Sequence, residues 1–155
     1  MGSVNRQDPD TDVLLPPYAY VPGQTPRHPE TLFADLHRTV EADMSVDQLA
    51  ATAAWRAGWV FLERGFFWES HEVLEPVWMQ TRPNSTERHL VQAVIQVANA
   101  GLKARMGRVR AVGRLCDLAQ IHLDASRRAG GEKLMQLRFD DLAERIDAFR
   151  ITAIR

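Results

Sequence analysis

The 155-residue chain has few of the features that would place it in a specialised class of protein. It has one cysteine, Cys116, which excludes an intrachain disulfide framework and a multi-cysteine zinc site. Its N-terminus lacks the pattern of a signal peptide, and no apolar run approaches the roughly 18 residues that cross a bilayer. With 19 basic and 20 acidic residues its formal charge is -1, so no strong field attracts nucleic acid or anionic lipid. These absences predict a cytoplasmic protein with neither a nucleic-acid nor a membrane partner.

The chain divides into a polar start, a proline-rich segment and a long helical remainder. Residues 1–12 are polar without periodicity and are expected to form a disordered tail. Residues 13–29 hold prolines and two tyrosines, which predicts an extended arm packed on the domain. Residues 30–155 are expected to form one helical domain, since the chain is too short for two comfortable cores.

Apolar residues at helical spacing run through most of the remainder. No alternating strand pattern occurs, so we predict an all-α, single-domain bundle of about five to six helices. Ser45, with Gln48 three residues later, predicts a capping box. Residues 133–137 are open to either a helical or an extended conformation. Helices are expected over residues 29–43, 46–64, 66–80, 86–106, 110–127 and 139–151.

The segment 65–78, GFFWESHEVLEPVW, places a histidine and carboxylates in an otherwise apolar helix. A helical projection puts His71 and Glu75 on the core side and Glu69 on a strip that water can reach. Pro76 removes a backbone donor and is expected to bend or break the helix. Trp68 and Trp78, the aromatic neighbours, are expected in the core or on the wall of a ligand pocket.

His71 and Glu75 stand at i and i+4, where two side chains can pair or share one metal ion. The string HExxE differs from the zinc-protease HExxH in its second ligand, and Glu72 would be the base of such a site. The alternative is a buried histidine–carboxylate pair that fixes helix packing. A third ligand would come from one of the other histidines, which are His28, His37, His89 and His122.

A second polar stripe follows one face of the helix expected over 86–106, through Gln92, Gln96, Asn99 and Lys103. Three consecutive amides favour a half-buried hydrogen-bonding surface that meets His71, because solvent faces usually carry charge. A solvated stripe is the equal alternative.

These motifs resemble those of the bacterial and archaeal family called domain of unknown function 309. The helix motif matches at Gly65, Phe67, Glu69, His71, Glu72, Glu75 and Trp78, and the following helix at Gln92, Ile95 and Gln96. The arm matches at Tyr20, Pro22, Gly23, His28 and Pro29. The resemblance implies a small all-helical domain of unassigned role, in which His71, Glu72, Glu75 and the two glutamines share one site with His28 as third partner. Pro76 departs from the glutamate that the family more often has there.

Three functional hypotheses follow. The first is a structural or small-ligand-binding domain built on a network of His71, Glu75, Gln92 and Gln96. The second is a metal-dependent, hydrolase-like enzyme with one divalent ion on His71, Glu75 and His28, and Glu72 as general base. The third is a module that acts through protein partners or self-association. Substrate, ligand and oligomeric state are left open by the sequence.

Overall fold

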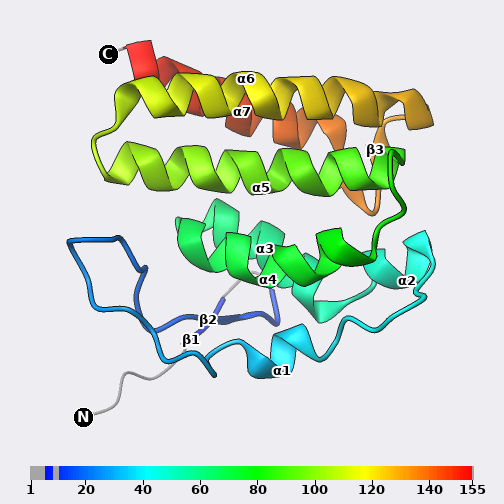
Figure 1. Ribbon diagram of the computed structural model, residues 1–155, viewed down its shortest axis with the longest axis horizontal. Coiled ribbons are helices and arrows are strands. Elements are labelled where there is room, and N and C mark those ends of the chain that lie inside the picture. Colours follow the sequence, from blue (N-terminus) through cyan, green and yellow to red (C-terminus); the bar gives the residue numbers. More distant parts are fainter. Residues whose placement is uncertain (1–5, 9–10, 155) are drawn as a thin grey trace.

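The computed structural model of the protein describes residues 6–8 and 11–154. Within them the chain is mostly helical, as predicted, with α5 (Thr86–Arg105) in the centre of the molecule (Figure 1). The pair α6 (Val109–Ser126) and α7 (Phe139–Ile154) packs on one side of α5. The pair α3 (Ala53–Glu63) and α4 (Phe67–Gln80) lies on the other side. No helix in the described residues is both long enough and apolar enough to cross a bilayer.

The N-terminal arm and the short helix α1 (Ala34–His37) lie beyond α3 and α4, on the side away from α5 (Figure 1). At the start of the arm, β2 (Leu14–Leu15) pairs antiparallel with β1 (Arg6–Gln7) of the preceding segment. The expected disordered tail falls partly on residues 1–5 and 9–10, outside the described residues. Its described part forms this strand, followed by the buried Asp8, which is bonded to Arg64.

The helix expected over 46–64 is two helices, α2 (Val46–Ala50) and α3, so the described chain has seven helices instead of five to six. Thr52 causes the break, because its hydroxyl donates to the Leu49 carbonyl at 2.8 Å and accepts the Trp55 amide at 3.2 Å. It ends one helix and caps the next. The predicted capping box of Ser45 and Gln48 opens α2.

The helix expected over 29–43 is much shorter, and only α1 is helical there. The Thr39 hydroxyl donates to the Leu36 carbonyl at 2.7 Å and accepts the Ala54 amide at 3.2 Å. A side chain that satisfies backbone groups in this way competes with continuation of the helix.

Pro76 lies inside α4 without ending it, so of the two expected outcomes, a bend or a break, the break does not occur. Proline cannot donate to the carbonyl of residue 72, four positions earlier. That Glu72 carbonyl instead accepts a bond from His37 Nε2 of α1 at 3.1 Å. A side chain from another helix therefore supplies the donor that the proline removes.

A hairpin joins α6 to α7 after the short 3-10 helix η1 (Arg127–Ala129), which makes the extended alternative for residues 133–137 the right one. Its strands are β3 (Lys133–Leu134) and β4 (Leu137–Arg138), and Met135 and Gln136 between them both have positive φ, as a type I′ turn requires. Trp55 Nε1 donates to the Met135 carbonyl at 2.8 Å. The hairpin is thereby fixed to α3.

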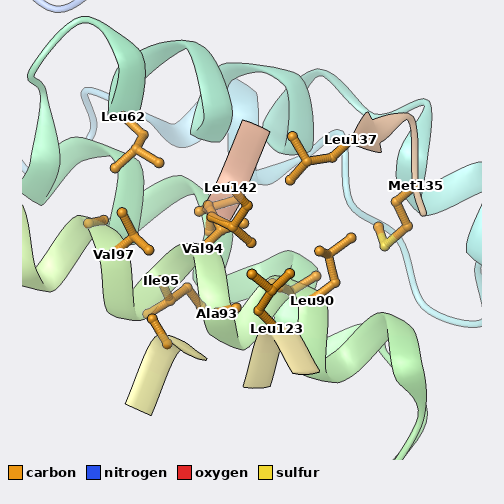
Figure 2. Packing of buried hydrophobic residues seen from close by; sticks show 14 of the residues in the cluster. Leu62, Leu90, Ala93, Val94, Ile95, Val97, Leu123, Met135, Leu137 and Leu142 are labelled. Atoms are coloured by element: carbon orange, nitrogen blue, oxygen red, sulfur yellow. The ribbon is translucent and has the colours of Figure 1, made fainter. Parts of the chain in front are cut away.

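The main core lies where α5 meets α3, α4, α6, α7 and the hairpin (Figure 2). Six of its side chains come from one α5 segment, which packs on nearly all sides: Leu90, Val91, Ala93, Val94, Ile95 and Val97. Cys116 is buried in this core, and burial raises the pKa of its thiol. A smaller cluster around Phe33, Phe61 and Val73 fills the space between α3, α4 and the arm.

Candidate functional site

The helix α4 carries the motif and packs one face against α3 and α5. Its buried positions are Glu69, Ser70, Val73, Leu74 and Val77. Two of these five side chains are polar, and each has a partner: Ser70 Oγ donates to the Gly58 carbonyl at 2.7 Å, and Glu69 pairs with the arm. The buried face of α4 therefore includes two polar residues of the motif, Glu69 and Ser70.

Glu69 is fully buried and meets His28 from the arm, 41 positions earlier in the chain. Its Oε2 lies 2.7 Å from His28 Nε2, with side-chain exposures of 0% and 1%. The same Oε2 accepts the backbone amide of Tyr20 at 2.7 Å. We call His28 and Glu69 the buried pair. The expectation that Glu69 faces water is wrong, since the arm covers it.

Aromatic rings enclose the buried pair. The His28 ring centroid lies 4.4 Å from that of Tyr18, 5.9 Å from Trp68 and 6.4 Å from Phe33. Tyr20 meets Trp68 edge-on at 5.1 Å. Trp68 is thus part of the surface on which the arm packs, and this low-dielectric surrounding strengthens the bonds of the pair.

Each partner of the buried pair keeps one polar atom without a hydrogen bond in the described residues. These are His28 Nδ1 and Glu69 Oε1. Unsatisfied buried polar atoms cost about 1 to 3 kcal/mol each, so the arm stays in place against a penalty. The penalty is offset by the two bonds to Oε2 and by the aromatic packing.

His71 and Glu75, which we call the surface pair, lie on the other side of α4. Their closest N–O distance is 4.0 Å, and the side chains are 36% and 57% exposed. The expectation that they point at the core is wrong. Residues two apart on a helix are about 200° apart around its axis, so burying Glu69 turns His71 outward. Glu72, the predicted base, has a half-buried side chain.

The described residues contain no group of three or more histidine, cysteine, aspartate or glutamate side chains placed to hold a metal ion. His28, the predicted third ligand for His71 and Glu75, has Nε2 against Glu69 instead. The chain thus brings His28 to α4, as the motif suggested, but to a different carboxylate.

The amide row on α5 is half-buried at Gln92, Gln96 and Asn99. Asn99 Nδ2 lies 3.4 Å from Gln96 Oε1, so two of the amides contact each other. Among the described residues no hydrogen bond is found between this row and the surface pair. Trp78, at the end of α4, instead lies under the guanidinium of Arg88, 3.9 Å from its ring centroid.

A histidine pair that sequence reasoning did not assemble joins α5 to α6. Nδ1 of His89 and Nδ1 of His122 lie 3.0 Å apart, so one ring donates and the other accepts. Burial lowers the pKa of His122, and the neighbouring His89 lowers it further. The two were only named separately as ligands, because no local spacing connects positions in different helices.

An open cavity of about 490 Å³ lies beside the arm, between β2, α1 and the start of α3. Apolar side chains dominate its wall, and Phe33 is shared with the aromatic shell of His28. Its lining includes Val13, Leu14, Pro16, Leu36, Ala57 and Phe61. Sequence reasoning missed this cavity, since its wall comes from three segments with no common motif.

Together these features define a small all-α domain whose motif helix is crossed by an N-terminal arm and joined to it by a buried histidine–glutamate pair. The family described as domain of unknown function (DUF309) matches residues 55–115. The matched segment runs from α3 into α6 and includes the motif helix α4, which confirms the resemblance predicted from the motifs. Neither a curated protein nor a solved structure matches the chain.

Proposed function

We propose that this domain binds a small apolar molecule in the cavity beside its arm, and that the buried pair of the motif helix holds the arm in place for that purpose. A volume of about 490 Å³ suits a small organic ligand, since such sites span roughly 300 to 1,000 Å³. The role of the motif is then to position a wall of the binding site.

The proposal rests on one observation: the same arm lines the cavity and also bonds to Glu69. Val13, Leu14 and Pro16 of the arm line the cavity, while Tyr20 and His28 of the same arm bond to Glu69. The arm has few other polar attachments to α4. Loss of the buried pair should therefore loosen the cavity wall as well as lower the stability of the fold.

The charges around the cavity favour an uncharged ligand. Asp12, Asp35 and Arg56 line it, so both signs are present. Asp35 is paired with Arg38, and Asp12 accepts a bond from Gln7 at 3.4 Å. Arg56 is exposed and has no ion pair among the described residues, so its guanidinium is free to donate to an oxygen. An apolar chain ending in a hydroxyl or carbonyl oxygen fits this pattern.

The test is a titration with 1-octanol followed by amide NMR, with octanoate and octylammonium as charged analogues of equal length. We expect saturable shifts at Phe33, Ala57 and Phe61, and weaker binding of both ions. Shifts that do not saturate, or that fall elsewhere on the molecule, would overturn the proposal.

A pair of variants separates binding from stability. Ala53 is exposed and lines the cavity, whereas Ala148 is exposed on α7, outside this lining. Ala53→Phe should reduce octanol affinity at least fivefold while Ala148→Phe leaves it unchanged. Equal affinity of the two variants would mean that the cavity is not the binding site, and that the buried pair serves the fold alone.

A further inference from the structure

A second cavity, of about 440 Å³, lies at the turn between α5 and α6, and its lining comes from the end of α5 and the start of α6. Gly107, with φ of +74°, makes the turn, and the Arg108 amide then donates to the Lys103 carbonyl at 2.9 Å. This closes α5 and brings its last residues beside the first turn of α6. The full lining is Lys103, Arg108, Val109, Arg110, Ala111 and Arg114.

Four of these six side chains are cationic and none is acidic. In the part of the chain that the structure describes, no carboxylate is paired with any of the four. Seven other arginines each lie within 4.0 Å of an acid: Arg38, Arg64, Arg82, Arg127, Arg138, Arg145 and Arg150. In a chain of net charge -1, four cations without a paired acid thus lie together at this turn.

The backbone adds to this charge. The helix α6 has 18 residues, no side-chain cap at Arg108 and no acid in its first turn. The amides of Val109, Arg110 and Ala111 precede the first intrahelical bond, which the Val112 amide makes to the Arg108 carbonyl at 3.2 Å. Because these three residues also line the cavity, the positive end of the helix dipole lies there.

We infer that this cavity binds a small phosphate-bearing molecule. Arginine guanidinium groups match phosphate oxygens in bidentate geometry, and a helix N-terminus offers further donors to the same anion. The volume exceeds that of one phosphate group, so the ligand carries a second phosphate or an organic part. The site is independent of the apolar cavity, because the two share no lining residue.

The small extent of this cationic cluster also distinguishes the site from a surface for nucleic acid. Backbone recognition uses a stripe or patch of cations that follows many phosphates, whereas here four cations converge on one turn. A nucleic-acid ligand is therefore an outcome of the test that would contradict the inference.

The experiment is calorimetric titration with pyrophosphate at low salt in a phosphate-free buffer, since screening weakens exposed charges. A single-stranded oligonucleotide serves as the competing ligand. We expect one saturable site for pyrophosphate, which weakens as salt rises, with amide shifts at Val109, Arg110 and Ala111. No saturable binding, or binding of the oligonucleotide only, overturns the inference.

Three variants of equal charge change complete the test. Lys103→Gln and Arg114→Gln remove cations from the cavity, while Arg128→Gln removes an exposed cation from η1. Each cavity variant should weaken pyrophosphate binding at least fivefold, and the control should not. An equal loss in all three would show that net charge, and no built site, attracts the anion. Matching melting temperatures confirm that the variants fold.

Discussion

The helix α4 carries two histidine–carboxylate pairs that differ in almost every physical respect. In the buried pair, His28 and Glu69 are 41 positions apart in sequence, 2.7 Å apart in space and shielded from water. In the surface pair, His71 and Glu75 are four positions apart, separated by 4.0 Å and partly exposed to water. Spacing along a helix shows which side chains could meet, but burial decides how much a contact contributes. The pair that local spacing reveals is the weaker of the two.

The largest expected effect comes from breaking the buried pair. Glu69→Ala should lower the free energy of unfolding by about 3 to 5 kcal/mol, because it leaves His28 and the Tyr20 amide without their acceptor. His28→Ala should cost less, since Tyr20 keeps its bond to Glu69. Urea denaturation measures both. A loss below about 1 kcal/mol for Glu69→Ala would show that the pair does not hold the arm.

A smaller effect tests how tightly the buried side of α4 is packed. A Cβ on Gly101 of α5 would lie 2.5 Å from the Phe67 ring, whereas one on Gly113 of α6 would meet nothing within 4 Å. Gly101→Ala should therefore destabilise the fold by about 1 to 3 kcal/mol. Gly113→Ala should stabilise it by about 0.5 to 1 kcal/mol, because glycine is a poor helix former. Thermal melts compare the two, and equal signs would contradict the packing described.

The histidine pair between α5 and α6 offers a pH-dependent comparison. The folded state lowers the pKa of His122 below its ordinary value of 6.5, chiefly by burial. The unfolded state then binds more protons below about pH 6.5, so stability falls as the pH falls through this range and is regained above it. His122→Asn should flatten that slope, measured by urea denaturation between pH 5 and 8. His71→Asn, outside this pair, is the control and should leave the slope contributed by His122 intact.

The smallest effect is expected at the surface pair. His71→Ala, Glu75→Ala and the double variant should show a coupling energy below about 0.5 kcal/mol, because exposed ion pairs contribute little. A double-mutant cycle in urea gives this value directly. A coupling energy above about 1.5 kcal/mol would contradict the view that the surface pair contributes much less to stability than the buried pair.

Much of the fold could be predicted because it depends on local chemistry. Ser45 with Gln48 marks the start of α2, and Gly65, with φ of +86°, follows the end of α3. Thr52 shows the limit of this approach. Its side chain divides a continuous apolar pattern into two helices, and nothing in the periodicity distinguishes such a break from a residue inside a helix.

The candidate site was harder to predict because α4 is apolar on most sides. Val73, Val77 and Phe66 surround the axis so widely that the projection left the phase of the helix ambiguous. The prediction of a buried pair between His71 and Glu75 is wrong, because the buried histidine–carboxylate pair instead joins Glu69 to His28 of the arm. Glu69 was already in the family motif, and its position two residues before His71 was the signal that only one of them could be buried.

The hydrogen bond between His37 and the Glu72 carbonyl constrains how positions 37 and 76 could evolve. Pro76 and the side-chain donor His37 depend on each other structurally, although they are 39 positions apart in the chain. A substitution that restores an amide at 76 would return the carbonyl to its own helix and release His37 from its role. We therefore expect the two positions to covary among relatives, with a donor at 37 retained mainly where proline stands at 76.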